Sequence, residues 1–319
     1  MTRLSVLDLS PVSSGSSSRQ ALLNTLDLAP FAESLGYTRY WLAEHHNTGL
    51  IASSSPEILI GQVGAVTSKM RIGSGGVMLP NHAPLKVAEN FRTLEALFPR
   101  RIDLGLGRAP GTDPRTAAAL RESRNAAQFP QQLEELIAFL KDEPERGIRA
   151  MPGGVEMPPL WLLGSSDFSA RLAAQRGLGF AFAHHINQPM PPAPLRLYQY
   201  NVAPSEYASE PRAILAVSAV CAETDDAAQE LASSANLTWL RFQSGGFHQP
   251  LPSVEEAMAY PYSDIERDFL HNSKGRMFVG SPATIRMQLQ ELATQAGVDE
   301  SIIMAYVTKS SRTFNRDSD

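Results

Sequence analysis

The sequence predicts an α/β protein that folds as a single (β/α)8 barrel domain over residues 1–319. Two observations favour this fold. Eight short apolar segments with strand character alternate with segments of helical periodicity, which is the order of elements in such barrels. The length of 319 residues also suits one barrel, because barrels of this kind commonly reach about 250 residues or more as one domain.

The predicted strands are short apolar runs that end at glycine, proline or polar residues. They cover residues 4–9, 37–44, 71–79, 101–107, 160–164, 179–184, 213–222 and 301–307. The third run is unusual because Gly73, Gly75 and Gly76 interrupt it. Glycine inside a strand often marks a bulge or a place where a ligand approaches the backbone.

The predicted helices repeat apolar residues at helical spacing. They cover residues 20–35, 56–69, 84–97, 131–141 and 167–175, and a last helix opens at 281–282. We expect Pro30 to kink the first helix and Gly36 to close it. Ser281 and Pro282 have the residue types of an N-cap followed by the first helical position.

One segment late in the chain, residues 233–274, departs from the alternation. It holds Gly245, Gly246 and three prolines, and no strand is evident in it. A long excursion late in a barrel is typical of a functional loop or lid, and a structural cap is the alternative. We therefore predict a long insertion there.

Composition narrows the possible partners. The net charge is −5 and no Lys/Arg-rich run offsets it, which disfavours a nucleic-acid partner. Cys221 is the one cysteine, so an intrachain disulfide and a cysteine zinc site are excluded. No apolar stretch approaches the roughly 20 residues that span a bilayer. Residues 1–4 lead into the first strand without a cleavage-site pattern, and we expect a cytoplasmic protein.

Glu44, His45 and His46 stand where the second predicted strand ends, the place where barrel enzymes keep catalytic residues. Side chains alternate along a strand, so His45 and His46 should point to opposite sides, which argues against a shared metal ion. We predict no metal site. A neutral imidazole here is suited to general-base chemistry, and a rim histidine that merely hydrogen-bonds a neighbour is the alternative.

Two further positions at the strand ends are candidates. At Gly75 and Gly76, a flat ring system could stack on bare backbone, or the glycines could form a bulge inside the barrel. Arg108 follows the fourth strand and is suited to hold an anion, although Asp113 or Glu44 could equally pair with it.

The turn that opens the helix of residues 167–175 joins serine hydroxyls to free backbone N–H groups, as a phosphate cradle does. Its candidate residues are Ser165, Ser166 and Ser169. Simple capping by Ser166 or Asp167 is the alternative. His184 and His185 close the sixth strand, and no role is assigned to them.

With these motifs in order, the chain resembles the luciferase-like flavin monooxygenases. Three stretches carry the resemblance: residues 41–46 (Trp-Leu-Ala-Glu-His-His), residues 76–90 and residues 98–108. Residues 164–166 and 279–282 are weaker matches. Their order and spacing hold over nearly the whole chain.

The resemblance implies a barrel that binds reduced FMN, with O₂ adding at the flavin C4a to give a peroxyflavin. It implies a catalytic imidazole at His45, beside Glu44 in the same motif. It also implies that the Gly75–Gly76 peptide, often cis in the family, lies under the isoalloxazine. The implied phosphate site consists of Arg108, Ser165, Ser166 and Ser169, with Arg121 as a candidate second arginine.

We therefore predict an FMN-dependent two-component monooxygenase that acts on a small organic substrate such as an aldehyde. No Gly-x-Gly-x-x-Gly fingerprint follows a strand, so reduced FMN would come from a separate flavin reductase. The alternatives are a deazaflavin-dependent hydride-transfer enzyme and a non-catalytic flavin-binding protein. A metal-dependent hydrolase is disfavoured, because the histidines are adjacent rather than spaced as His-x-His.

We also expect a homodimer. The resemblance favours pairing through helices near residues 56–69, where Gly61, Gly64 and Ala65 form a small-residue surface. The same residues could instead serve packing within the chain.

Overall fold

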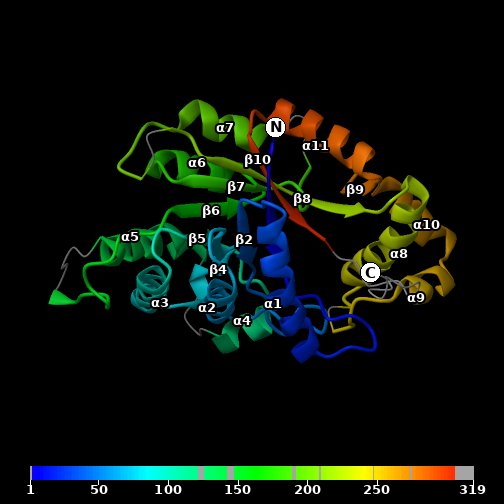
Figure 1. Cartoon of the computed structure of the whole chain (residues 1–319), viewed down its shortest axis with the longest axis horizontal. Coiled ribbons are helices and arrows are strands. Elements are labelled where there is room, and N and C mark those ends of the chain that lie inside the picture. Colours follow the sequence, from blue (N-terminus) through cyan, green and yellow to red (C-terminus); the bar gives the residue numbers. More distant parts are fainter. Residues whose placement is uncertain are drawn as a thin grey trace.

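The predicted barrel is present in the computed structural model, which describes residues 2–120, 126–141, 147–188, 192–207, 210–246, 248–273 and 275–305. Eight parallel strand positions form a closed ring, because β10 pairs with both β1 and β8 (Figure 1). In order around the barrel the strands are β1 (Arg3–Asp8), β2 (Arg39–Leu42), β3 (Arg71–Ser74), β5 (Ile102–Gly107), β6 (Leu160–Gly164), β7 (Gly179–Ala183), β8 (Ala213–Cys221) and β10 (Glu300–Met304).

The third strand position differs from the prediction of one continuous strand over residues 71–79. It consists of β3 and the two-residue β4 (Val77–Met78), separated by a cis peptide bond between Gly75 and Gly76. A Cβ atom at Gly75 would lie 2.7 Å from Leu7 Cδ1, and one at Gly76 would lie 2.8 Å from the Gly105 carbonyl oxygen. Both glycines are therefore required by the close approach of the barrel's own atoms.

Helices cover the outside of the barrel. Those that match predicted segments are α1 (Ser18–Ser34), α2 (Pro56–Val66), α3 (Pro84–Leu97), α5 (Phe129–Leu140), α6 (Asp167–Arg176) and α11 (Pro282–Ala296). The sequence did not indicate α4 (Pro114–Leu120) or α7 (Ala193–Asn201). Gly36 follows α1 with a φ of +80°, and Tyr37 N–H donates to the Ala32 carbonyl, so Gly36 closes this helix as predicted.

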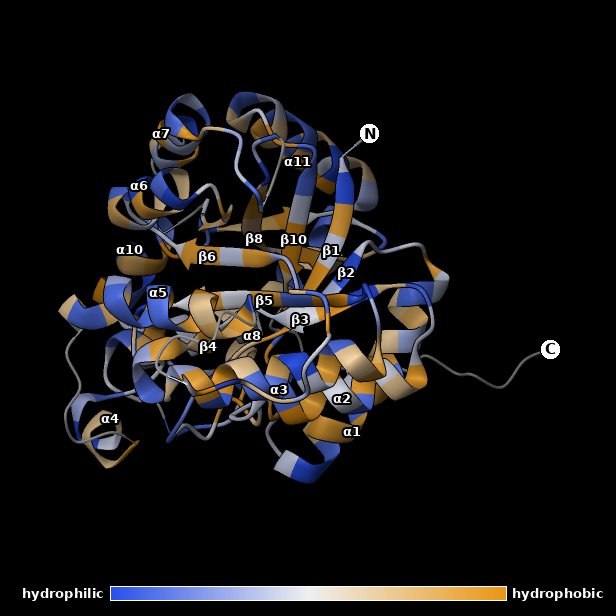
Figure 2. Cartoon of the chain, turned by 90° about the vertical axis from the view of Figure 1, so that its left-hand side faces the viewer, coloured by the Kyte–Doolittle hydropathy of each residue, from blue (hydrophilic) through white to orange (hydrophobic). Residues whose placement is uncertain are grey.

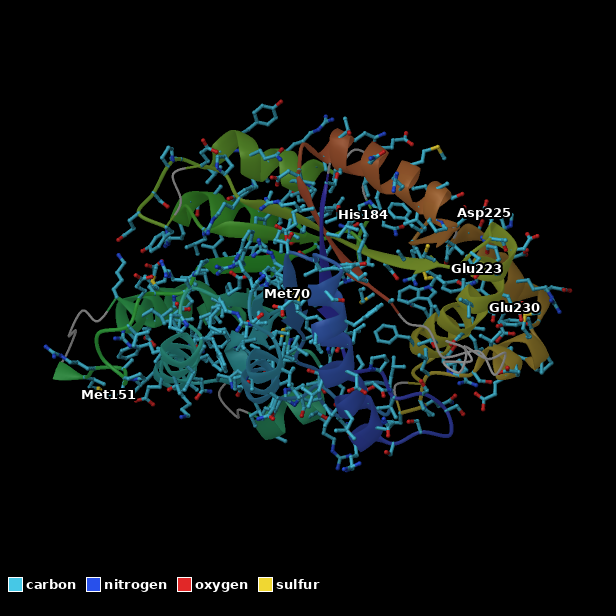
Figure 3. All side chains as sticks on the ribbon, viewed as in Figure 1. Met70, Met151, His184, Glu223, Asp225 and Glu230 are labelled. Carbon is cyan, nitrogen blue, oxygen red and sulfur yellow. The ribbon has the colours of Figure 1, made fainter. Side chains whose placement is uncertain are left out.

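The late insertion is longer and more regular than predicted. It begins at α8 (Asp225–Gln243), before residue 233, and continues through α9 (Val254–Ala259) and α10 (Asp264–Asn272). It also contains a strand, β9 (Met277–Gly280), which pairs with the carboxyl end of β8. Figure 1 shows α8, α9 and α10 together on one side of the molecule, and Figure 3 shows Asp225 and Glu230 at the end away from Met151.

The insertion is joined to the loop between β1 and α1. Leu251 N–H donates to the Val12 carbonyl at 2.8 Å, and Ser14 N–H donates to the Leu251 carbonyl at 2.7 Å. The Ser14 hydroxyl also donates to Glu256 at 2.6 Å. These bonds connect the insertion to the barrel rim.

Apolar side chains pack on both sides of the strands, and Figure 2 shows hydrophobic residues along β6 and β10. Inside the barrel, Trp41 and Trp161 meet edge to face with ring centroids 5.6 Å apart. At the amino ends of the strands a buried ionic cluster closes the interior. Arg39 donates to Asp103 at 2.7 Å and to Glu300 at 2.5 Å, and Arg71 donates to Asp103 at 2.6 Å.

The small residues of α2 serve packing between neighbouring helices of the same chain. A Cβ atom at Gly64 would lie 2.7 Å from the Phe98 ring, just beyond α3, and one at Gly61 would lie 3.7 Å from Leu94. The homodimer stays a prediction. Among the described residues, no helix combines the length and the hydropathy that crossing a bilayer requires.

Candidate active site

Glu44 lies at the centre of a hydrogen-bonded cluster at the carboxyl end of β2. Its side chain is fully buried and accepts from His46 Nε2 at 2.8 Å, from His82 Nε2 at 2.9 Å and from Asn81 Nδ2 at 2.9 Å. The backbone N–H of Met78 donates to it at 2.8 Å. Burial alone would raise the pKa of Glu44, but these donors outweigh it and lower the pKa to about 2.

The cluster gives Glu44 a clear structural task. The carboxylate fastens the loop after β2 to β4 and to the turn of residues 79–82, so it holds its neighbour His45 in place. His82 and Asn81 were absent from the sequence-based site. The short 3-10 helix Leu79–Asn81 brings them to Glu44, and nothing in their spacing from Glu44 signals this contact.

His45 differs from its neighbour His46. His46 is bonded to Glu44, whereas Nδ1 of His45 is buried and has no hydrogen-bond partner in the described structure. Its backbone N–H donates to the Ser53 carbonyl at 3.0 Å, which fixes the chain at this point. Burial outweighs the attraction of Glu44 and lowers the pKa of His45 to about 4, so the imidazole is neutral near pH 7.

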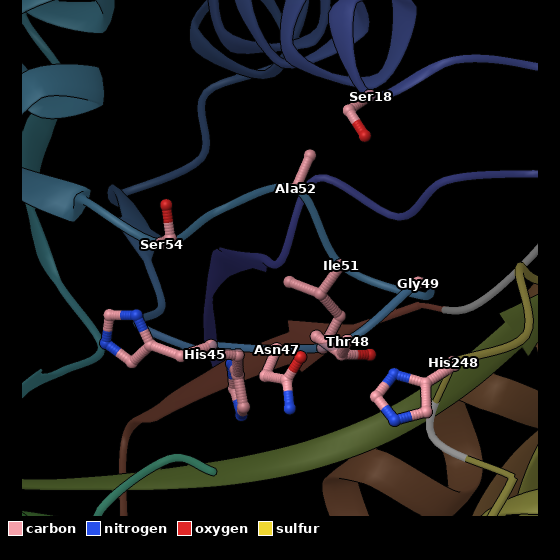
Figure 4. A pocket seen from close by; sticks show the side chains of 10 residues that line it. Ser18, His45, Asn47, Thr48, Gly49, Ile51, Ala52, Ser54 and His248 are labelled. Atoms are coloured by element: carbon pink, nitrogen blue, oxygen red, sulfur yellow. The ribbon is translucent and has the colours of Figure 1, made fainter. Parts of the chain in front are cut away.

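The side chain of His45 borders a pocket of about 410 Å³ (Figure 4). The loop of residues 45–54 forms most of its wall, Ser18 adds the start of α1, and His248 adds the insertion. His45 is thus a neutral imidazole at the edge of an open space, a position that suits a general base. No group of His, Cys, Asp and Glu side chains within the described ranges is arranged to hold a metal ion.

Two more imidazoles lie at the carboxyl end of β7. His184 is 5% exposed, and its Nε2 has no partner among the described residues (Figure 3 labels it). His185 Nδ1 donates to the Ala216 carbonyl at 3.2 Å. Burial lowers the pKa of both, to about 4 for His185, and the proximity of His45 contributes to that shift. The histidines that follow β2 and β7 therefore lie at the same end of the barrel.

Arg108 and the start of α6 lie together. The guanidinium carbon of Arg108 is 4.1 Å from the ring centroid of Phe168, in the first turn of α6. In the described part of the chain no carboxylate pairs with Arg108: Asp113 is bonded to Asn47 and Thr116, and Glu44 is engaged as above. The pairings considered from sequence are therefore not formed.

The serine turn keeps its polar groups available. Ser166 is the N-cap of α6, but its side chain makes no capping bond, so simple capping does not explain it. The Ser165 carbonyl accepts from Asn187 at 2.8 Å, and Ser169 is buried against Gly164. A free arginine beside an uncapped helix start is suited to bind a phosphate. Arg121, the other suggested arginine, lies outside the described residues.

Comparison with known proteins agrees with this geometry. The sequence matches the luciferase-like monooxygenase family over residues 2–300. The chain belongs to this family. It is similar to a luciferase-like monooxygenase of Escherichia coli (strain K12), with 42% identity over 94% of this chain and 90% of the relative. It is 44% identical to an N-acetyl-S-alkylcysteine monooxygenase of Bacillus subtilis (strain 168), over 59% of this chain and 58% of that one.

Solved structures share the fold. The structure of apo-MsnO8 superposes with a TM-score of 0.90 at 37% identity and covers 97% of this chain and 94% of its own. The oxygenating constituent of 3,6-diketocamphane monooxygenase from Pseudomonas putida, solved in complex with FMN, superposes with a TM-score of 0.70 at 20% identity. That likeness covers 96% of this chain and 92% of the other. This luciferase-like chain is thus an enzyme of a monooxygenase family on a (β/α)8 barrel.

Proposed function

We propose that this luciferase-like protein is an FMN-dependent two-component monooxygenase that oxidises a small organic substrate, such as an aldehyde, with O₂. One observation carries the proposal. The same end of the barrel presents a neutral, unpartnered imidazole at His45 and a free arginine beside an uncapped helix start at Arg108 and Ser166. The first suits proton transfer, and the second suits the phosphate of a nucleotide cofactor.

The residues present fit FMN. Arg108, the hydroxyls of Ser165 and Ser166 and the N–H groups of the first turn of α6 would hold the phosphate. Gly75 and Gly76, between β3 and β4, stand where the family resemblance would place the flat ring of the cofactor. The Pseudomonas neighbour, solved with FMN, supports this choice. Reduced FMN, when bound, supplies the electrons and the means to activate O₂.

The chain's own residues supply positioning and a proton acceptor. His45 would take or return a proton, because a pKa of about 4 keeps its imidazole neutral at neutral pH. Glu44 holds the loop that carries His45, through His46 and His82. The insertion would exclude water from the mouth. We propose a separate flavin reductase as the source of reduced FMN.

The first test combines binding with reaction. Flavin-free protein is titrated with reduced FMN under argon and then mixed with O₂ in a stopped-flow spectrometer. We expect tight binding in the wild type, at least tenfold weaker binding in R108M, and normal binding in H45A. In H45A, bound flavin should return to its oxidised form faster and release more hydrogen peroxide. H271A is the matched control, because His271 lies on exposed α10.

The alternatives predict other results. Preference for a reduced deazaflavin over reduced FMN would favour hydride transfer. Tight FMN binding, with oxidation kinetics equal to those of free flavin and unaffected by H45A, would indicate a flavin-binding protein. Failure to bind either flavin would overturn the cofactor assignment.

A further inference from the structure

Arg276 lies at the mouth of the barrel and belongs to the insertion. It stands directly before β9, whose first residue, Met277, pairs with Ser218 on β8. β10 pairs with the preceding part of β8 and ends at the same level, because Met304 also pairs with Ser218. Arg276 therefore stands where β10 ends and the insertion takes over its place beside β8.

The guanidinium of Arg276 is held flat on an aromatic wall. Its central carbon lies 3.3 Å from the ring centroid of Trp239, on α8. Trp239 in turn stacks on Phe242, with ring centroids 5.7 Å apart and planes inclined by 12°. A guanidinium stacked in this way keeps its edge, with its N–H donors, available to a ligand.

This cation has no anionic partner in the described part of the chain. No carboxylate lies within ion-pair distance of Arg276, and burial lowers its pKa to about 10 without any acidic group to oppose the shift. The contrast with Arg39 is direct, since two carboxylates bind that side chain. A half-buried charge without a counter-ion is costly, and a bound anion would remove the cost.

Arg276 lies at the same end of the barrel as His45, because it stands beside the carboxyl-terminal half of β8. Arg276 and His45 are both close enough to His185 to contribute to the lowering of its pKa. The strand order separates Arg276 from the phosphate cradle. β5, which carries Arg108 at its end, lies across the ring from β10, where Arg276 stands. An anion at Arg276 is therefore a different group from the phosphate at Arg108.

We propose that Arg276 and Trp239 form a subsite that binds the carboxylate of an organic substrate. This inference rests on the proposed function for the reaction that the substrate undergoes, and the binding itself does not. Arg276 receives the two carboxylate oxygens in bidentate fashion, and Trp239 holds the plane of the guanidinium. Trp239 Nε1, which is buried and has no described partner, offers a further donor at the same wall. The substrate class is thus an organic acid, oriented with its carboxylate toward β9.

The test uses the full-length, flavin-free protein and a pair of small probes, benzoate and its uncharged isostere benzamide. Binding is measured by calorimetry and by tryptophan fluorescence, and W239F identifies the part of the signal that comes from Trp239, because Trp41 and Trp161 also emit. We expect benzoate to bind at least tenfold more tightly than benzamide and to change the fluorescence. R276M should abolish the preference, and R276K should retain part of it.

The controls separate this subsite from its alternatives. R286M removes an exposed arginine of α11 and should leave the preference unchanged. W239F keeps the charge and should weaken benzoate binding by a few-fold. Equal binding of the two probes by the wild type, absence of benzoate binding, or an unchanged preference in R276M would overturn the proposal. Loss of the preference in R108M instead would place the anion in the phosphate cradle and would also overturn it.

Failure of the proposed function gives a different pattern. A protein that prefers benzoate but binds no reduced flavin keeps the subsite and loses the monooxygenase assignment. A protein that binds reduced FMN without preferring benzoate keeps the assignment and loses the subsite. If Arg276 only braces the insertion, R276M should weaken benzoate and benzamide equally.

Discussion

The two ends of the barrel treat charge in opposite ways. At the amino ends of the strands, Arg39 and Arg71 bind Asp103 and Glu300, and both carboxylates are at most 2% exposed. Burial opposes the ionisation of Asp103, but Arg39 and Arg71 outweigh it and lower its pKa. Arg212 is the exception there, because two of its nitrogens have no described partner.

At the carboxyl ends, several charged and polar groups have no partner in the described part of the chain. Arg108 and Arg276 lie on aromatic rings without a carboxylate, and His45 and His184 each keep a buried nitrogen without a described partner. The Glu44 cluster is the saturated element here, and it holds the loop that carries His45. One end of the barrel is therefore arranged for stability, while the other keeps polar groups to which a ligand can bind.

The largest expected effect on stability comes from disrupting the ionic cluster at the amino ends of the strands. Asp103→Ala leaves Arg71 without its carboxylate and Arg39 with Glu300 as its one carboxylate partner, so it should lower the free energy of unfolding by about 3–5 kcal/mol. Denaturant titration measures this. Asp299→Ala, which removes the exposed pair with Arg3, is the matched control and should cost less than about 1 kcal/mol. Equal losses in the two variants would refute the comparison.

A smaller effect is expected at the Glu44 cluster. Glu44→Gln keeps the shape of the side chain but removes the negative charge to which His46, His82 and the Met78 N–H donate hydrogen bonds. It should lower the free energy of unfolding by about 2 kcal/mol. The variant should also weaken the dependence of flavin oxidation on His45, because the loop shifts. Denaturant titration and the stopped-flow assay measure the two effects. Glu291→Gln, at an exposed position on α11, should change neither, and a wild-type-like E44Q would show that the cluster does not position the loop.

Lowering the pH should destabilise the carboxyl end of the barrel before the amino end. The folded protein keeps His45 and His185 neutral, with a pKa of about 4, whereas the unfolded chain protonates them near pH 6.5. Their contribution to stability is therefore complete above pH 6.5 and is lost as the pH falls toward 4. His45→Gln should reduce this acid-induced loss by about 1–3 kcal/mol, as unfolding measurements at pH 7 and pH 4.5 can show. A loss as large as that of the wild type would contradict the lowered pKa of His45.

The smallest expected effect on stability concerns the N-cap residues of two helices, α11 and α6. Ser281 caps α11 through its side chain, so Ser281→Ala should cost about 1 kcal/mol of stability. Ser166 makes no such bond, and Ser166→Ala should cost only about a few tenths of that amount. It should instead weaken the binding of reduced FMN several-fold, as titration under argon would measure. Equal stability losses with unchanged FMN binding would assign Ser166 an ordinary capping role.

The apolar strands and the outer helices could be predicted from periodicity, because each buries a continuous apolar face. The insertion could not. The buried face of α8 is made largely of small residues, such as Ala228, Ala232 and Ser234, so its apolar stripe is faint. β9 is a four-residue strand that is mostly half-buried, and pairing with β8 rather than its composition defines it.

The candidate site divides in the same way. Glu44, His45 and Arg108 could be predicted because they directly follow strands that the sequence reveals. His82 and Arg276 could not, because their roles depend on turns that bring them to Glu44 and Trp239 from elsewhere in the chain. Position at a strand end is a local property, whereas contact across loops is a property of the folded molecule.

The backbone hydrogen bonds between Leu251 and the loop that joins β1 to α1 affect how fast small molecules enter and leave the mouth of the barrel. Moving the insertion away from this side of the rim breaks two backbone hydrogen bonds and the hydrogen bond between Ser14 and Glu256. At about 1 kcal/mol for each, the opened form would hold less than roughly one molecule in a hundred. A compound bound under the insertion would then have its residence time set by this rare opening. Hydrogen exchange at the Ser14 and Leu251 amides would report the population of the opened form.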